Sequence, residues 1–284
     1  MLGDTQSRSK PEQVFIIAEL GSCHDMSLNN LERLIRGSAE AGASAAKLQY
    51  WSDPEEMAKR RNAMKFLDLY SYYRIPDDWL PTAAALCGKY GIELMCTAYL
   101  AQDAKKVAPF VSRMKIASFE FLDEELRTET LKCGKPIYIS VGMASHQEIY
   151  TVAANLIDFR ETPDVTFMQC TSSYPSKICD ANLAWITRCR SAFQPPLKVG
   201  YSDHAAKDCL EMGGLAVAAG ATAIEVHVRL EHTWPRNPDY DHSITIEQLS
   251  DYIAFIRKAE LAMGNPDKEM QPCETEMSQY RVKG

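Results

Sequence analysis

Acidic, basic and imidazole side chains in this chain stand at the ends of short apolar, β-branched runs rather than in their middles. The residues that show this pattern include Glu19, Lys47, Gln49, Lys115, Ser118, Glu120, Ser202, His204 and His227. A charged side chain in an apolar strand is costly unless its charge is satisfied, so a repeated pattern of this kind indicates a functional site. Because the carboxyl ends of parallel strands meet on one face of a barrel, these side chains are predicted to converge there.

Two histidines end consecutive predicted strands. His204 and His227 hold matched positions, so both imidazoles can reach one point on the barrel axis. Imidazole suits a divalent ion such as Mn²⁺, Zn²⁺ or Fe²⁺, and the pair is therefore a candidate metal site. The alternative is two histidines that only pack in the core or in loops. We expect His146, His232 and His242 to be solvated.

Lys47 and Lys115 end the second and fourth predicted strands, where a lysine serves as a point charge for phosphate or carboxylate. Hydroxyl residues end strands as well, namely Thr97, Ser118, Ser140 and Ser202. Together these groups predict an anion-binding cradle for a phosphorylated substrate. Schiff-base chemistry at either lysine is the competing use, and it needs a lysine in an apolar pocket.

The candidate carboxylates are Glu19, Glu120 and Asp239. Glu19 directly ends the first strand, where burial would raise its pKa into a range that is useful for acid–base chemistry. Glu225 lies two residues before His227 and could share its face, but its neighbours favour a structural role.

The elements that carry these residues alternate between strand-like and helix-like patterns. The predicted strands are 14–19, 45–49, 92–97, 114–118, 136–141, 164–170, 198–202 and 223–228. The predicted helices are 29–41, 77–90, 101–107, 123–132, 145–157, 181–190, 205–219 and 246–263. Eight such units favour an α/β fold, a single-domain (β/α)₈ TIM barrel. An open doubly wound sheet is the alternative, but the chain lacks a glycine-rich dinucleotide turn after the first strand.

Three segments lie outside these repeated units. We expect residues 1–13 to be an N-terminal tail, 14–264 to be the barrel and 265–284 to be a polar C-terminal extension. Residues 51–75 form a connection that is longer than most βα loops. This connection is predicted to be either a lid over the site or an ordinary helical insertion beside the barrel.

Composition excludes several classes of function. The net charge is −7 with no basic run, which argues against nucleic acid as a partner. The nine cysteines are odd in number and lack CxxC spacing, which favours a reducing compartment. The chain begins without an apolar leader, and no apolar run approaches the ~20 residues that span a membrane. We therefore expect a cytoplasmic protein with no membrane partner.

A series of motifs in order along the chain resembles the sialic acid synthase (N-acetylneuraminate synthase) family. The matching segments are Ile16–Gly21 with His24, Ala46–Gln49, Met114–Ser118, Gly134–Ile137, Ser140–Met143, Gln169–Pro175, Gly200–His204, Ile224–His227 and Pro238–Asp239. The resemblance implies a barrel enzyme that condenses phosphoenolpyruvate (PEP) with the open-chain aldehyde of a hexosamine. Phosphate is then released by C–O cleavage.

The resemblance also implies roles for individual residues. His204 and His227 would hold a divalent metal, with Mn²⁺ expected and Mg²⁺, Co²⁺, Zn²⁺ or Fe²⁺ as alternatives. Glu19 would manage the water or proton at the reacting centre. The residues expected to grip PEP are Lys47, Thr97, Lys115, Ser118, Ser140 and Ser202. Those expected to contact the acceptor are Gln49, Glu120, Tyr174 and Asp239.

The sequence departs from the family pattern on the acceptor side. Ser22 and Cys23 replace the usual pair of asparagines, Tyr240 replaces a histidine and Ser172 replaces an asparagine. Family members usually carry a C-terminal antifreeze-like cap domain, which supplies an arginine to a partner's site. In this sequence, residues 274–283 resemble only the linker that leads to that domain. We therefore expect an unusual aldehyde, a homodimer, and either the 51–73 loop or a separate cap-domain partner over the site.

Two other functions compete with this one. A 3-deoxy-octulosonate or heptulosonate phosphate synthase would share PEP but needs an extra basic site for the acceptor's phosphate. A catalytically inactive barrel that serves as a binding subunit is the second alternative. The retained strand-end charges argue against it, since an inactive barrel has no physical need for buried charges.

Overall fold

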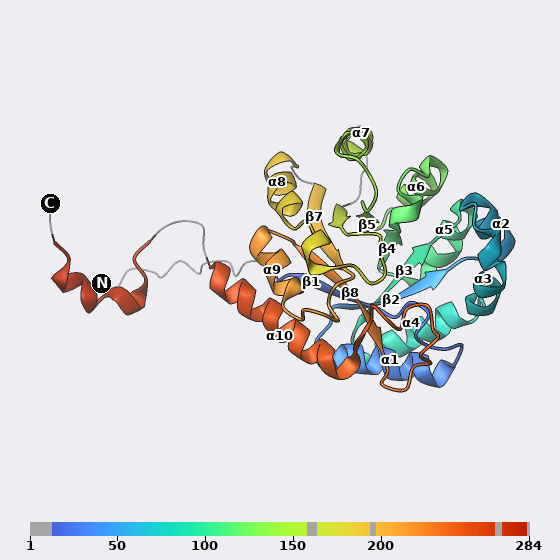
Figure 1. Cartoon of the computed structure of the whole chain (residues 1–284), viewed down its shortest axis with the longest axis horizontal. Helices are drawn as coiled ribbons and strands as arrows, with labels where there is room; N and C mark the ends of the chain where they lie inside the picture. Colours follow the sequence, from blue (N-terminus) through green and yellow to red (C-terminus); the bar gives the residue numbers. More distant parts are fainter. Residues whose placement is uncertain (1–12, 158–163, 194–196, 265–268, 283–284) are drawn as a thin grey trace.

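The protein is a closed barrel of parallel strands, seen in a computed structural model that describes residues 13–157, 164–193, 197–264 and 269–282. The strands are β1 (Phe15–Glu19), β2 (Ala45–Tyr50), β3 (Glu93–Ala98), β4 (Arg113–Ile116), β5 (Ile137–Ser140), β6 (Val165–Gln169), β7 (Leu197–Asp203) and β8 (Ala223–Arg229). Each pairs in parallel with the next, and β1 pairs with β8 to close the barrel (Figure 1). The predicted TIM barrel is therefore confirmed. A short strand, β9 (Ile244–Thr245), pairs in parallel with the end of β8.

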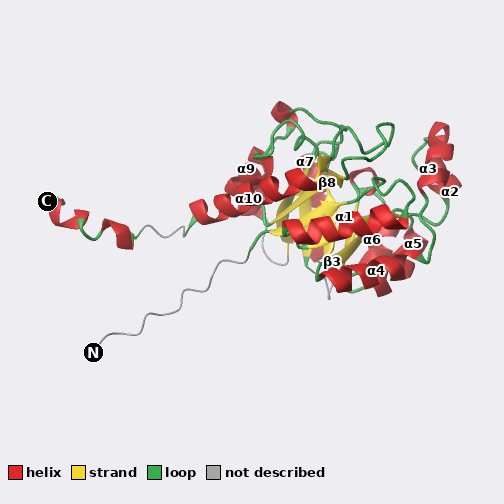
Figure 2. Ribbon diagram, turned by 90° about the horizontal axis from the view of Figure 1, so that it is seen from below, coloured by secondary structure: helices red, strands yellow, loops and turns green. Residues whose placement is uncertain are grey.

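Helices surround the barrel (Figure 2). They are α1 (Leu28–Ala41), α4 (Trp79–Tyr90), α5 (Ala101–Val107), α6 (Glu124–Leu131), α7 (His146–Ile157), α8 (Ala184–Ala192), α9 (Met212–Ala219) and α10 (Ile246–Met263). The helix predicted from residue 205 begins only at Met212, because residues 205–211 form turns. One of these turns is held by Asp203, whose carboxylate accepts from the backbone N–H of Ala205.

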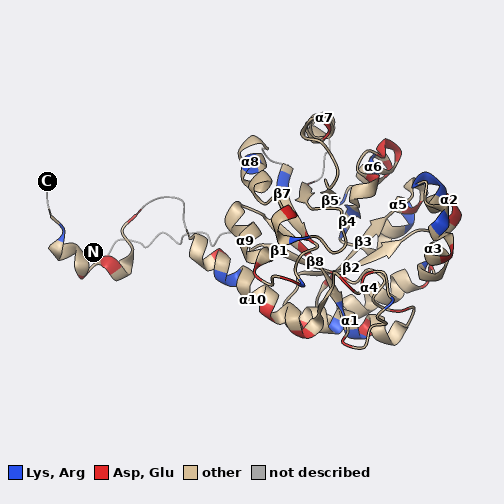
Figure 3. Cartoon of the chain, viewed as in Figure 1, with Lys and Arg blue, Asp and Glu red and all other residues tan. Residues whose placement is uncertain are grey.

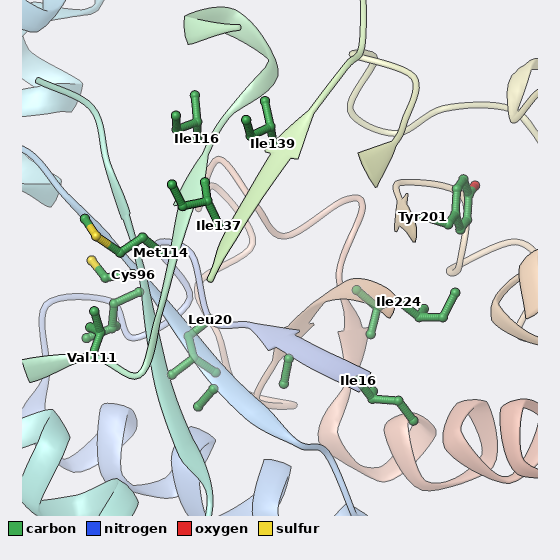
Figure 4. Close-up of a cluster of buried hydrophobic side chains, with 14 of the residues drawn as sticks. Ile16, Leu20, Cys96, Val111, Met114, Ile116, Ile137, Ile139, Tyr201 and Ile224 are labelled. Atoms are coloured by element: carbon green, nitrogen blue, oxygen red, sulfur yellow. The ribbon is translucent and has the colours of Figure 1, made fainter. Parts of the chain in front are cut away.

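The local sequence accounts for α1. Ser27 caps its N-terminus by accepting from the Asn30 N–H, and Gly42 ends it in the left-handed conformation at φ 92°. Leu31 and Leu34 lie on the buried face of the helix, which packs against the barrel. Figure 4 shows the apolar layer between strands and helices, with strand residues such as Ile16 pointing outward into it.

The polar site stands on an apolar plug inside the barrel. The plug consists of Ile17, Ala45, Met95, Tyr138, Met168 and Ala223, one from each of six strands. Side chains of a strand alternate between its two faces, so the residue two positions further along also points inward. Those positions hold Glu19, Lys47, Thr97, Ser140, Cys170 and Glu225, of which all but the cysteine carry a charge or a hydroxyl group. The strand period therefore places a ring of polar groups directly above the plug.

The long connection after β2 forms α2 (Pro54–Arg60), a 3₁₀ turn at Met64–Phe66 and α3 (Leu67–Tyr73). Trp51 and Tyr73 are buried in a small apolar cluster of their own beneath it. The connection is thus a folded helical insertion beside the barrel mouth, with α2 and α3 on the side of β2 and β3 (Figure 1).

The predicted terminal segments are described only in part. Of the expected tail at 1–13, only Gln13 lies within the described residues, and 265–268 and 283–284 of the expected extension lie outside them. Residues 269–282 carry two 3₁₀ turns, at Pro272–Glu274 and Met277–Tyr280, and are exposed throughout. Among the described helices, none is long and apolar enough to cross a membrane.

Candidate active site

A cavity of about 410 Å³ opens at the carboxyl ends of the strands. The residues predicted for the site that line it are Glu19, Lys47, Gln49, Thr97, Lys115, Ser118, Ser140, Tyr174, Ser202, His204, His227 and Asp239. They come from strands or loops on all sides of the barrel, and the fold brings them to one face as the sequence pattern indicated. The roles assigned to them individually stay predictions.

Two buried lysines form the floor of the cavity. The Lys47 ammonium lies 2.5 Å from a Glu19 oxygen and donates to the Thr97 hydroxyl at 3.0 Å. The Lys115 ammonium donates to the Ser140 hydroxyl at 2.7 Å. Both lysine side chains are 3% exposed, so their charges need partners within the protein.

Glu225 is the carboxylate that the two lysines share. Its Oε1 lies 3.6 Å from the Lys47 ammonium and 3.4 Å from that of Lys115, and it accepts from the Ser202 hydroxyl at 3.1 Å. Burial alone would raise the Glu225 pKa, but the two ammonium groups lower it to about 2. Glu225 therefore compensates the positive charge of the two lysines.

Glu19 lies at the other edge of the floor. Its side chain is 1% exposed, and its Oε1 accepts from the Gln49 amide at 2.6 Å. Burial raises the pKa of Glu19 above its usual value, with Lys47 acting against the shift. The pKa of Lys47 is raised as well, because Glu19 and Glu225 together outweigh its burial. A carboxyl of this kind can hold and release a proton next to a cation.

Three imidazoles meet on the wall formed by β7, β8 and the loop after β8. The His204 and His227 rings are 5.6 Å apart, and the His242 ring lies 4.5 Å from that of His227. His242 is 2% exposed, so the prediction that it is solvated is wrong. The loop after β8 folds back into the barrel mouth, a return that the local sequence does not reveal. His232 is exposed, as predicted.

His227, His242 and Asp239 offer ligand atoms that all lie within 4.8 Å of one another. Among the described residues, His227 Nδ1 and both ring nitrogens of His242 are buried without a hydrogen-bond partner. The nearest charged group is Asp239, whose Oδ1 lies 3.3 Å from His242 Nε2. Burial lowers the pKa of His204 to about 4 and that of His227 well below its usual value. The imidazoles of His204 and His227 are thus neutral near pH 7, which is the form that binds metal ions.

Asp239 is fixed by the start of the loop after β1. Its Oδ2 accepts from the Ser22 backbone N–H at 2.6 Å and from the Ser22 hydroxyl at 2.7 Å. Gly21 precedes this contact with φ 49°, and a Cβ atom there would lie 2.2 Å from Asp239 Oδ2. Glycine is therefore required at position 21 both by its backbone conformation and by the close approach of this carboxylate.

Glu120 is the predicted acceptor residue that does not line the cavity. Its carboxylate lies behind Arg61 and accepts from the guanidinium at 2.7 Å and 2.8 Å. Arg61, from the insertion, lines the cavity instead. His24, which packs against Trp79, and Cys23 are both buried, and neither lines the cavity.

A barrel with buried lysines, carboxylates and neutral imidazoles at its carboxyl-terminal face belongs to the class of (β/α)₈ enzymes that act on an anionic substrate. Comparison with known proteins identifies the branch of this class. The NeuB family profile matches residues 34–268. A pseudaminic acid synthase of Campylobacter jejuni is 30% identical over 266 residues, which cover 89% of this chain and 76% of that protein.

Two further comparisons agree. An N-acetylneuraminate-9-phosphate synthase of Mus musculus is 31% identical over 285 residues, covering 92% of this chain and 74% of the mouse protein. The crystal structure of the N-acetylneuraminic acid (sialic acid) synthetase from Leptospira borgpetersenii superposes with a TM-score of 0.85 at 28% identity, covering 95% of this chain and 91% of the other. The chain belongs to the NeuB family, so the resemblance and the enzyme class predicted from the sequence, a PEP-condensing transferase, are confirmed.

Proposed function

We propose that this enzyme joins PEP to the open-chain aldehyde of a hexosamine-type sugar and releases inorganic phosphate. The observation that carries the proposal is the pair of buried lysines in the same cavity as a cluster of buried imidazoles. The lysines suit the two anionic groups of PEP, and the imidazole wall suits the polarisation of an aldehyde. The relatives' names support a sugar-acid product, and the particular sugar is part of this proposal.

The floor of the cavity is assigned to PEP. Lys47 and Lys115, with Thr97 and Ser140 beside them, present cations and hydroxyls to a phosphate or carboxylate. Ser118 and Ser202 line the same cavity and extend this set. Each ammonium lies beside a carboxylate, which suits a fixed charge rather than a Schiff-base nucleophile. Glu19 and Glu225 raise the pKa of Lys47, whereas burial lowers the pKa of Lys115 against the effect of Glu225.

The imidazole wall is assigned to a divalent metal ion, for which Mn²⁺ is our choice. The buried, unpartnered nitrogens of His227 and His242 and the nearby Asp239 carboxylate fit such an ion, and His204 faces the same space. When bound, the ion polarises the aldehyde oxygen as a Lewis acid. Tyr174 packs against the His204 ring, with 4.3 Å between ring centres.

Glu19 is assigned the proton transfer. In the overall reaction, C3 of PEP bonds to the aldehyde carbon, and the aldehyde oxygen takes up a proton to become a hydroxyl. Water supplies an oxygen to C2, the C2–O bond to phosphate breaks, and the second proton of the water leaves with phosphate. The raised pKa of Glu19 lets it take a proton from that water, while Gln49 fixes the orientation of its carboxyl group. Asp239 and Tyr174 remain our proposed contacts to the acceptor. The division into three segments, the homodimer and a separate cap-domain partner remain predictions.

Phosphate release from PEP with Mn²⁺ and a panel of aldoses tests the proposal. We expect release that depends on one or a few acceptors and that stops when the ion is chelated. His204→Ala and His227→Ala should abolish turnover and weaken Mn²⁺ uptake, whereas His232→Ala, at an exposed histidine outside the cavity lining, should change neither. Full activity after chelation would contradict the metal assignment, and no release with any aldose would contradict the proposed reaction.

A further inference from the structure

A second, lower cavity lies at the amino-terminal end of the barrel, on the other side of the apolar plug. Its volume is about 170 Å³, and its lining comes from residues near the starts of β1 and β4–β8. No described residue lines both this cavity and the catalytic one, so the proposed function makes no use of it. A cavity of about 150 Å³ in another protein holds benzene, so the lower cavity has room for a small organic molecule.

One side of the lower cavity is a row of hydrogen-bond donors. Parallel pairing places Tyr138 of β5 level with Thr166 of β6. Tyr138 belongs to the plug, and Thr166 precedes the plug residue Met168 by two positions, so both side chains point into the barrel. Arg113 of β4 donates to the Tyr138 hydroxyl at 3.4 Å. Three neighbouring strands thus offer a guanidinium and two hydroxyl groups to the same space.

The two hydroxyl groups are buried and are not fully used. Tyr138 and Thr166 are each 5% exposed. Among the described residues, the Thr166 hydroxyl has no hydrogen-bond partner, and the Tyr138 hydroxyl accepts from Arg113 but finds no acceptor of its own. Burial raises the pKa of Tyr138, so its hydroxyl keeps its proton and can donate. Buried hydroxyl groups are normally satisfied, so this pair points to a ligand that accepts from both.

Arg113 adds a positive charge to the row. Its Nε donates to Glu93 at 2.9 Å, and its guanidinium lies over the Phe15 ring, 4.2 Å from the ring centre. Its Nη1 carries two N–H groups, and Tyr138 is the acceptor of one of them, so a donor remains for a ligand. Because Glu93 balances the charge of Arg113, the row suits a singly charged group better than a phosphate dianion.

The rest of the lining is largely apolar. Phe15, Pro136 and Ala223 present apolar surface to the lower cavity. Both β4 and β7 carry basic residues, which are blue in Figure 3, but Lys198 of β7 pairs with Asp164 at 3.2 Å and is not needed for the row. A row of donors beside an apolar surface matches a carboxylate that is attached to a short apolar body.

We propose that the lower cavity is a second binding site, which takes a small carboxylate whose apolar body is no larger than about the size of benzene. The carboxylate accepts from Arg113, Tyr138 and Thr166, and the apolar body lies against Phe15 and Pro136. The plug separates this ligand from the catalytic cavity, so it is not a substrate of the condensation. The inference does not depend on the proposed function.

Calorimetric titration with butyrate and benzoate tests the site, and benzamide is the matched ligand without a charge. We expect both carboxylates to bind and benzamide to bind at least about tenfold more weakly than benzoate, since hydrogen bonds to a charged acceptor are lost. Thr166→Val and Tyr138→Phe each remove one hydroxyl group, and each should weaken benzoate binding about tenfold. Thr82→Val is the matched control, because the Thr82 hydroxyl lies outside the cavity and donates to the backbone of Asp78. It should bind benzoate like the wild type.

Thermal unfolding separates a binding role from a folding role. The Thr166 hydroxyl has no partner, so Thr166→Val should not lower the Tm of the free protein. Benzoate should raise the Tm of the wild type and of Thr82→Val, because a ligand that binds the folded state stabilises it. It should leave the Tm of Thr166→Val nearly unchanged.

A carboxylate could also bind to the lysines of the catalytic cavity, and Lys115→Met distinguishes the two places. Benzoate binding should persist in this variant, because Lys115 lies above the plug and outside the lower cavity. Loss of binding in Lys115→Met with full binding in Thr166→Val would overturn the proposal. No binding of either carboxylate at millimolar concentrations would overturn it as well, as would equal affinity for benzoate and benzamide.

Discussion

Replacing Lys115 by methionine removes one of the two cations of the floor and keeps most of its length. The Lys115 ammonium uses one N–H for Ser140 at 2.7 Å and lies 3.4 Å from Glu225, which leaves a donor for the substrate. Loss of one partner of a buried, hydrogen-bonded charge pair costs about 2–5 kcal/mol in binding. We therefore expect the PEP KM of Lys115→Met to rise at least about 30-fold.

The same substitution also changes stability. Without Lys115, Glu225 keeps only the Lys47 ammonium at 3.6 Å and the Ser202 hydroxyl. Breaking a buried ion pair costs about 3–5 kcal/mol, and the remaining partners place this case near 3 kcal/mol. For a domain of this size that corresponds to a fall in Tm of roughly 6–12 °C. The double variant Lys115→Met/Glu225→Gln removes both charges and should recover most of this loss.

Phosphate release at varied PEP concentrations measures the first effect, and thermal unfolding measures the second. Lys198→Met is the matched control, because Lys198 lies near the start of β7, outside the site cavity, and pairs with Asp164. It should leave the PEP KM unchanged. A PEP KM for Lys115→Met within twofold of the wild type would refute the assignment of Lys115 to PEP. A double variant less stable than Lys115→Met would refute the proposed charge coupling.

Three shorter predictions concern the same cavity. His242→Ala should weaken Mn²⁺ binding at least about tenfold, measured by the electron spin resonance of free Mn²⁺, and unchanged binding would remove His242 from the metal site. Borohydride added during turnover should trap no adduct on Lys47 or Lys115, whereas a modified lysine found by mass spectrometry would establish a Schiff base. Gly21→Ala would place a Cβ atom against Asp239 in a residue with φ 49°. The free energy of unfolding should therefore fall by about 1–3 kcal/mol, and Mn²⁺ binding should weaken. A variant equal to the wild type in both measurements would show that Asp239 can move freely.

The sequence by itself was sufficient for the barrel and for most of the polar ring. Alternating strand and helix patterns predicted all eight strands, and polar residues at their ends predicted the face on which Glu19, Lys47 and His227 meet. This succeeded because the strand period is two: a residue two positions beyond a buried inward side chain points to the same interior. Register then follows from barrel closure, which pairs Glu19 with Lys47 on one side and with His227 on the other.

Only the tertiary structure decided which groups face the cavity from the long connections. His242 was expected in solvent, yet contacts of Asp239 with Ser22, 217 residues away, accompany a loop that buries it beside His227. Glu120 was expected at the acceptor, yet Arg61 from the insertion covers it. Loops have no period that fixes the direction of a side chain, and their conformation is set by partners distant in sequence. The residues at the strand ends can therefore be predicted from the sequence. The cavity residues from the loop after β8 and from the insertion after β2 depend on the packing of the folded chain.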